Sequence, residues 1–196
     1  KVAVLDLGVK RSILSCLTDR GCYLKVFPMN TSIEDMTMWS PDGFMLSNGP
    51  GDPSAMSDVI ETVKRMTELE IPIFGICLGH QVLSLASGLT TRKMHNGHRG
   101  VNHPVINLQT GKCEVTSQNH GFVVEKESLS NNSDIEITHT HLNDNTLAGI
   151  KFKNKKIFSV QYHPEASAGP HDSRYLFDDF IANISEMVKR NKAVVS

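Results

Sequence analysis

Apolar runs and amphipathic stretches alternate along the first half of the chain. Short apolar runs predict strands at residues 2–7, 23–28, 43–47 and 71–76. Apolar positions at helical spacing predict helices over residues 10–20, 54–69 and 79–87. Strands that alternate with helices in this way are typical of a mainly parallel sheet covered by helices on both faces.

The pattern changes after Gly88, where turn-forming residues separate shorter runs of alternating polarity. These runs predict antiparallel strands and hairpins at residues 103–108, 112–117, 121–125, 135–140, 146–152 and 156–161. An amphipathic stretch at 173–181 predicts a closing helix, and we expect a frayed basic tail beyond it. The expected fold class is therefore α/β, an open and mainly parallel sheet with antiparallel, β-rich additions in the second half. A ligand site in such a sheet lies at the carboxyl ends of the parallel strands.

Composition narrows the class of protein without identifying it. The 196 residues carry a net charge of −1 and are 39% hydrophobic, which suits one compact domain and gives no sign of a nucleic-acid partner. No run of about eighteen apolar residues and no signal-peptide pattern occurs, so we expect a cytoplasmic chain without a membrane partner. The four cysteines are scattered and form no Cys-x-x-Cys pair. Because the chain enters a strand directly after Lys1, we expect a fragment of a longer protein.

The stretch Gly75–Gly79 places one cysteine between two glycines, directly after the apolar run 71–74. This spacing predicts a nucleophile elbow, in which a sharp strand-to-helix turn exposes the side chain of Cys77 above the sheet. The N-terminus of the following helix favours a thiolate over a thiol. The alternative is a small buried cysteine followed by an ordinary turn glycine, and the pentapeptide alone does not decide between the two.

A second motif, Gln161–Glu165, follows the apolar strand predicted near 157–160. Alternation along an extended backbone lets His163 and Glu165 point the same way, with Pro164 stiffening the link. A cysteine nucleophile is usually paired with an imidazole base, which a carboxylate holds in one tautomer. The two motifs together suggest a Cys77–His163–Glu165 triad. Spacing alone does not prove the pairing, and His163 taken by itself fits a surface loop.

Two further groups of residues carry weaker signals. The turn Asn48–Pro53 contains Gly49 and Gly51 but matches no phosphate-binding pattern, so the residues alone favour an ordinary turn. Several histidines resemble a supply of metal ligands, but they have no compact ligand spacing. We expect structural or surface roles for them, and no metal site: His95, His98, His103, His120, His139 and His141.

These motifs resemble the class I glutamine amidotransferase domain, with the cysteine elbow at 75–81 and His-Pro-Glu at 163–165. Further segments narrow the resemblance to the glutamine-hydrolysing small chains of carbamoyl-phosphate synthetase: residues 5–11, 47–53, 98–105, 116–122 and 163–172. The segments at 98–105 and 116–122 distinguish these chains from amidotransferases that serve anthranilate or GMP synthesis. The resemblance covers nearly the whole chain. It implies a flavodoxin-like class I amidotransferase domain over residues 1–196, without the N-terminal domain of the small chain.

The resemblance also implies roles for individual residues. Cys77 would be the nucleophile, His163 the acid and base, and Glu165 the residue that orients His163. The backbone N–H groups of Gly49 and Leu78 would form an oxyanion hole. Glutamine would be held by Gly49, Gly51, Leu78, Gln81, Asn119, Gly121 and Phe122. We expect Lys10 to orient the site or to contact the absent domain, without a catalytic role.

The implied reaction is hydrolysis of L-glutamine to glutamate and ammonia through a γ-glutamyl thioester. The ammonia would pass to a large ATP-binding synthetase chain, which uses bicarbonate, ATP and magnesium to make carbamoyl phosphate for arginine or pyrimidine biosynthesis. This chain itself would need no cofactor. Two alternatives stay open, a catalytically silent regulatory domain and an amidotransferase of another pathway, with a cysteine peptidase or esterase as a more remote one. The complete triad argues against silence, and the two discriminating segments argue against another pathway.

Overall fold

The structure, a computed structural model, describes residues 1–166 and 169–195, with side chains up to residue 193. In these ranges one mixed sheet has the strand order β2-β1-β3-β4-β9-β8-β7-β5-β6. The strands are β1 Val2–Asp6, β2 Leu24–Pro28, β3 Gly43–Leu46, β4 Ile73–Ile76, β5 Thr91–Asn107, β6 Cys113–Val124, β7 Ile135–His141, β8 Leu147–Phe152 and β9 Ile157–Val160. The helices are α1 Arg11–Thr18, α2 Ile33–Met38, α3 Ser57–Glu68, α4 Leu78–Ala86 and α5 Tyr175–Val195, with 3₁₀ turns η1 Pro53–Ala55 and η2 Lys126–Asn131.

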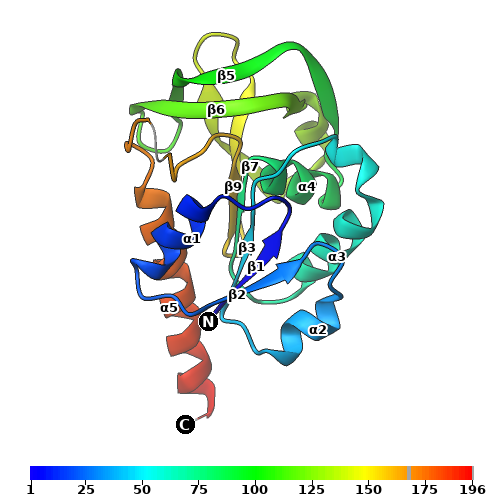
Figure 1. Cartoon of the computed structure of the whole chain (residues 1–196), viewed down its shortest axis with the longest axis vertical. Helices are drawn as coiled ribbons and strands as arrows, with labels where there is room; N and C mark the ends of the chain where they lie inside the picture. Colours follow the sequence, from blue (N-terminus) through cyan, green and yellow to red (C-terminus); the bar gives the residue numbers. More distant parts are fainter. Residues whose placement is uncertain (167–168, 196) are drawn as a thin grey trace.

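The strands β2, β1, β3, β4 and β9 run parallel to one another. Helices α1 and α5 cover one face of this part of the sheet, and α2, α3 and α4 lie over the other face (Figure 1). Successive residues of a strand therefore belong to different cores. Val2 and Val4 of β1 pack toward α1 and α5, whereas Ala3 and Leu5 pack toward the other three helices. Burial on both faces explains the continuous apolar runs in the sequence.

The antiparallel half is formed by β8, β7, β5 and β6, which extend the sheet beyond β9. The long strands β5 and β6 cross the top of the molecule as a ribbon (Figure 1). Their pairing shifts between Lys93 and His98 and again between Gly100 and His103. Such irregularities bend a strand and increase its twist. The ribbon thereby contributes to the same cavity as the loops that follow β1 and β3.

The predicted elements of the parallel half match the observed ones closely, but two details of the second half differ. Residues 91–102, for which no strand was expected, form the first part of β5. The separate runs at 112–117 and 121–125 belong to one strand, β6. The pattern failed there because Gln118 and His120 are polar yet buried. In addition, β9 pairs antiparallel with β8 but parallel with β4, so it belongs to both halves of the sheet.

Two helices also differ from the prediction. The short helix α2 was missed, although Ser32 caps it by accepting a hydrogen bond from the N–H of Asp35 at 3.1 Å. A helix of this length is too short to show a periodic apolar pattern. The closing helix α5 continues to Val195, through the basic residues expected to fray. None of the described helices is both long and apolar enough to cross a membrane.

Candidate active site

Cys77 lies at the sharp turn between β4 and α4. Its backbone has φ 53° and ψ −103°, outside the regions that L residues usually adopt. The turn requires glycine at position 79, because a Cβ there would lie 2.3 Å from the carbonyl oxygen of Leu46 in β3. Helix α4 can therefore approach β3 closely and begin directly after the cysteine. A strained residue at such a turn is typical of a nucleophile elbow.

His163 and Glu165 follow β9, the strand that pairs with β4. Nδ1 of His163 lies 2.7 Å from Oε1 of Glu165, and both side chains are buried. The backbone N–H of His163 donates to the carbonyl of Ser117 at 2.9 Å, which fixes this segment against β6. Since Nδ1 faces the carboxylate, Nε2 is the nitrogen left to interact with Cys77. The fold thus brings together the three residues of the predicted triad.

The charge state of this group depends on His163. Burial by itself lowers the pKa of an imidazole, but hydrogen bonds with Cys77 and Glu165 outweigh burial and raise the pKa of His163 to about 9. This upward shift favours the protonated form of His163. An imidazolium next to the sulfur stabilises a thiolate, which is the nucleophilic form of a cysteine.

Glu165 is completely buried, and Lys10 approaches it from the solvent side. Nζ of Lys10 lies 3.8 Å from Oε1 of Glu165, and about half of the Lys10 side chain is exposed. The backbone N–H of Lys10 donates to Oδ1 of Asn48 at 3.0 Å, which ties the turn after β1 to the turn after β3. No hydrogen-bond partner for Oε2 of Glu165 occurs among residues 1–166 and 169–193. Residues 167 and 168 of the segment 163–172 lie outside the described residues.

The loop after β3 brings Gly49 against the elbow. A Cβ at Gly49 would lie 1.8 Å from the carbonyl oxygen of Leu7 and 2.9 Å from Cδ2 of Leu78, so a larger residue would force the backbone to move. Leu78 is the first residue of α4, where a backbone N–H has no carbonyl partner within the helix. Gly49 and Leu78 therefore lie side by side next to Cys77, as an oxyanion hole requires.

A cavity of about 610 Å³ opens beside Cys77 and His163. Most of the residues predicted to hold glutamine line it: Gly49, Gly51, Gln81, Asn119, Gly121 and Phe122. The thiol of Cys77 lies 3.9 Å from the carbonyl oxygen of Asn119 on the same wall. The side chain of Leu78 is buried and does not line the cavity, so its predicted contact would come from the backbone. Glu165 likewise lies behind His163 and away from the wall.

Gln161 was not predicted as a site residue, although it begins the motif that contains His163. Its Nε2 lies 3.8 Å from Sγ of Cys77, and its Oε1 accepts a hydrogen bond from Nε2 of Gln81 at 3.0 Å. The same Gln81 nitrogen donates to the carbonyl of Phe122 at 2.8 Å. Both hydrogens of the Gln81 amide are therefore used, which leaves its Oε1 free to accept from a ligand.

Positive charge also lines the cavity, from Lys10, Lys93 and Arg99. Lys93 and Arg99 were not predicted, because they lie in the first part of β5, where no strand was expected. The guanidinium of Arg99 donates to the carbonyl of Asn96 at 2.8 Å and lies next to Gly121. A carboxylate that entered the cavity would meet these cations.

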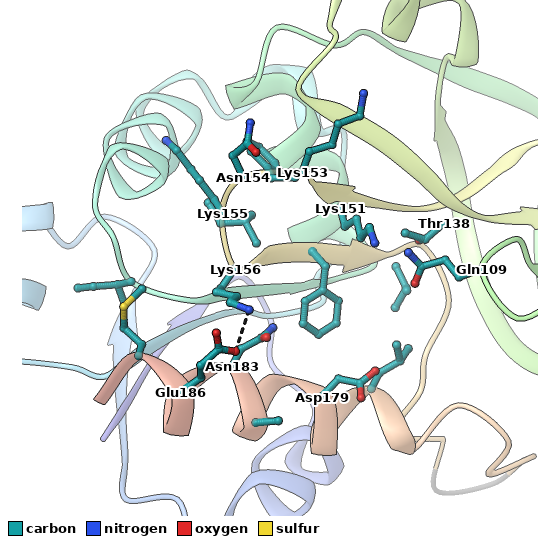
Figure 2. Close-up of a pocket in the computed structure, with 18 of the residues that line it drawn as sticks. Gln109, Thr138, Lys151, Lys153, Asn154, Lys155, Lys156, Asp179, Asn183 and Glu186 are labelled. Carbon is teal, nitrogen blue, oxygen red and sulfur yellow. Dashed lines mark hydrogen bonds and ion pairs between the residues drawn. The ribbon is translucent and has the colours of Figure 1, made fainter. Parts of the chain in front are cut away.

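Another cavity, of about 640 Å³, lies away from the triad, between α5 and the β8–β9 hairpin (Figure 2). Lysines surround it, but Lys156 forms an ion pair with Glu186 at 2.8 Å, drawn as a dashed line in Figure 2. Lys151 pairs with Glu136 at the same distance. None of the described residues around this cavity is a cysteine. Of the two cavities, the one beside Cys77 is therefore the one that a cysteine lines.

Comparison with known proteins identifies the family of this chain. The family model for class I glutamine amidotransferases matches residues 3–183. The chain belongs to this family. A carbamoyl phosphate synthase small chain from Bacillus cereus is 52% identical over 192 residues, which are 98% of this amidotransferase chain and 52% of that relative. The corresponding proteins of Staphylococcus haemolyticus and Fusobacterium nucleatum are 50% and 49% identical, over 97% and 96% of the chain. The chain spans about half the length of these relatives.

A solved structure shares the amidotransferase fold. It is that of a protein assigned to GMP synthase from Thermoplasma acidophilum, with a TM-score of 0.84 and 20% identity over 97% of this chain and 96% of that chain. At this identity the likeness shows the fold alone. The predicted α/β class I amidotransferase fold is confirmed by it, and the family resemblance by the family model. The roles of individual site residues stay predictions.

Proposed function

We propose that this amidotransferase domain hydrolyses L-glutamine and supplies ammonia as part of the small chain of a carbamoyl phosphate synthase. The observation that carries the proposal is the position of Cys77, at a strained elbow beside the buried His163–Glu165 pair and on the wall of a cavity large enough for an amino acid. The three bacterial relatives described above support the choice of pathway.

Attack by Cys77 begins the proposed reaction. The thiolate sulfur forms a bond to the side-chain carbonyl carbon of glutamine, and the carbonyl oxygen takes the negative charge. The N–H groups of Gly49 and Leu78 stabilise this charge, which appears only in the tetrahedral intermediate. The C–N bond then breaks while the Nε2 proton of His163 passes to the leaving nitrogen. Ammonia departs, and a γ-glutamyl thioester remains.

Water completes the cycle. The neutral His163 removes a proton from a water molecule, whose oxygen attacks the thioester carbon. The C–S bond breaks, the γ-carboxylic acid leaves and loses its proton to solvent to give glutamate, and Cys77 returns to its thiolate form beside the imidazolium. Glu165 keeps Nδ1 of His163 protonated and stabilises the imidazolium in both halves of the reaction.

The cavity wall offers groups for both charged ends of glutamine. Lys93 and Arg99 supply positive charge for the α-carboxylate. Backbone carbonyls in the stretch 119–122 can accept hydrogen bonds from the ammonium group. Oε1 of Gln81 supplies one more acceptor, because the Gln81 nitrogen is already engaged. These contacts hold the side-chain amide of the substrate toward Cys77.

A large ATP-binding synthetase chain would receive the ammonia, and ATP and magnesium would be used there. This domain needs no cofactor in the proposed scheme, because a thiolate, an imidazole and backbone amides carry every step. The proposed compartment is the cytoplasm, since the four cysteines are free thiols.

Matched cysteine variants test the proposal. Cys77→Ser should lower the kcat of glutamine hydrolysis by several orders of magnitude, because an alkoxide is far harder to form than a thiolate. Cys113→Ser changes an exposed cysteine at the start of β6 and should keep the parent rate. A Cys77→Ser variant that hydrolyses glutamine as fast as the parent would remove Cys77 from the mechanism.

The identity of the partner separates the remaining alternatives. Co-purification with a large ATP-binding chain that makes carbamoyl phosphate would support the assignment. A partner that makes anthranilate or GMP would replace it with another pathway. Glutamine binding without turnover, both alone and with the partner present, would instead indicate a silent regulatory domain.

A further inference from the structure

Outside the proposed active site, three side chains converge where β5, the end of β7 and the β7–β8 turn meet. They are His98, His141 and Asp144, and one ligand atom from each lies within 4.8 Å of the other two. Nε2 of His98 lies 2.8 Å from Oδ2 of Asp144, and Nδ1 of His141 lies 3.4 Å from its Oδ1. Both imidazoles are buried, whereas 40% of the Asp144 side chain is exposed and opens the cluster to solvent.

Hydrogen bonds around His98 determine which of its nitrogens carries hydrogen. The hydroxyl of Thr116 donates to the carbonyl of His103 at 2.7 Å, so its oxygen can only accept from Nε2 of Gln118, at 3.1 Å. This fixes the orientation of the Gln118 amide and directs its Oε1 toward Nδ1 of His98, at 3.1 Å. Nδ1 of His98 is therefore the donor. In the neutral imidazole the Nε2 lone pair then faces the carboxylate of Asp144.

His141 is oriented in a similar way. Its Nδ1 accepts a hydrogen bond from the N–H of Asn143 at 3.2 Å, so its hydrogen is on Nε2. Nε2 donates to Nδ1 of His103 at 3.1 Å, which holds the ring in place. The lone pair of Nδ1 thus lies on the side of Asp144, where a cation could replace the long hydrogen bond from Asn143.

The carboxylate of Asp144 is itself held in position. Its Oδ1 accepts from both the N–H and the hydroxyl of Thr146, at 3.1 and 2.8 Å. The nearby ammonium of Lys126 donates to Oδ1 of Asn145 at 2.7 Å. The two imidazoles are stacked, and the lone pair of each therefore faces one oxygen of the carboxylate, which is unfavourable unless positive charge lies between them.

We propose that His98 Nε2, His141 Nδ1 and the carboxylate of Asp144 bind a divalent transition-metal cation of the zinc class, with water completing its coordination. Two imidazoles and one carboxylate are a ligand set that suits zinc. Zinc–ligand distances of about 2.0–2.2 Å in a tetrahedral site place neighbouring ligand atoms roughly 3.3 Å apart. The ligand atoms here lie within 4.8 Å of one another, and the stacked rings of His98 and His141 would have to turn for both lone pairs to point at one ion. Gln118 and His103 would act as the outer groups that fix the two imidazole tautomers.

A cation at this position would link β5 to the β7–β8 turn and stabilise the antiparallel half of the fold. The cluster also reaches toward the cavity beside Cys77, because Nδ1 of His98 lies 3.3 Å from Nε2 of His120. His120 lines that cavity. The proposed metal has no role in the chemistry at Cys77, so its test does not depend on glutamine turnover.

Calorimetric titration of the full 196-residue chain with zinc chloride tests the site. All variants carry Cys77→Ser, because a thiolate also binds zinc. We expect one zinc ion per chain and a raised thermal midpoint in this background and in the control His95→Ala, whose imidazole is exposed on β5. Asp144→Asn keeps the oxygen that accepts from Thr146 but removes the charge, so it should weaken zinc binding by about tenfold or more.

A second variant and a second metal keep the test decisive. His141→Phe fills the ring volume without a ligand atom and should also weaken zinc binding, with circular dichroism to verify the fold. Cobalt(II) should give visible absorption bands of a low-coordinate site in the parent, and these bands should be absent in Asp144→Asn. Equal zinc affinity in all variants would overturn the proposal, as would an absence of zinc binding in the folded Cys77→Ser chain. The second result would leave the contact between His98 and Asp144 as a side-chain pair without a metal.

Discussion

Replacement of Gly49 by alanine tests how the loop after β3 contributes to catalysis. The added Cβ would lie 1.8 Å from the carbonyl oxygen of Leu7 and 2.6 Å from its carbonyl carbon, whereas real Cβ contacts are essentially never shorter than 3.0 Å. Leu7 is buried and its N–H donates to the hydroxyl of Ser47, so the strain should displace the loop by roughly 1 Å.

The expected effect falls mainly on kcat. A displacement of about 1 Å near the reacting groups can cost about 100-fold in rate, and loss of one oxyanion-hole donor costs about 10²–10³-fold. We therefore expect Gly49→Ala to lower kcat for glutamine by about 100-fold or more. KM should change less, because the lost hydrogen bond forms only in the transition state.

Gly51→Ala is the matched control in the same loop. Its φ of +107° also strains an alanine, but nothing lies within 4 Å of the added Cβ, so kcat should fall far less. Steady-state glutaminase kinetics and thermal unfolding of both variants separate a displaced loop from an unfolded chain. A folded Gly49→Ala variant with kcat within about twofold of the parent would refute both the close approach to Leu7 and the oxyanion role of Gly49.

Three further predictions concern the triad, the buried histidines and the substrate carboxylate. His163→Asn should lower glutaminase kcat about as much as Cys77→Ser, because acid and base are lost together. Glu165→Gln should lower kcat less, because Glu165 only orients His163. A larger loss of kcat in Glu165→Gln than in His163→Asn would exchange their roles. Burial lowers the pKa of His80 and of His120 to about 3. The contribution of their neutral imidazoles to the free energy of unfolding is therefore lost as the pH falls below 6.5. The raised pKa of His163, about 9, makes its contribution fully present below pH 6.5 and lost as the pH rises through 9. The thermal midpoint should therefore pass through a maximum near neutral pH, and a midpoint that climbs steadily to pH 9 would contradict this assignment. Arg99→Gln should raise KM for glutamine by about tenfold with little change in kcat, and an unchanged KM would exclude Arg99 from carboxylate binding.

Local chemistry in the sequence predicted the nucleophile elbow, although the pentapeptide alone left a small buried cysteine open as the alternative. Gly75, Cys77 and Gly79 specify the turn because the steric demands of the strand-to-helix corner act within a few residues, although the partner that requires Gly79, the carbonyl of Leu46, appears only in the structure. The parallel strands were predictable for a related reason. Burial on both faces requires nearly continuous apolar runs, and such runs are visible without knowing their neighbours.

Prediction of strands from apolar runs failed where polar residues are buried. The break predicted within β6 falls at Gln118 and His120, whose side chains lie close to each other and within hydrogen-bonding distance of His98 in the folded chain. The resemblance to a family named Cys77, His163 and Glu165, but it could not give the 2.7 Å contact between His163 and Glu165 or the raised pKa that follows. Those depend on how β9 lies beside β4.

Contacts between distant segments were decided only by the tertiary structure. Lys93 and Arg99 reach the cavity beside Cys77 because β5 bends where its pairing with β6 shifts. His98, His141 and Asp144 converge because β5 pairs antiparallel with β7, with Val105 opposite His141. Strand register is set by the packing of whole faces against the core, so no local spacing in the sequence records which side chains will meet.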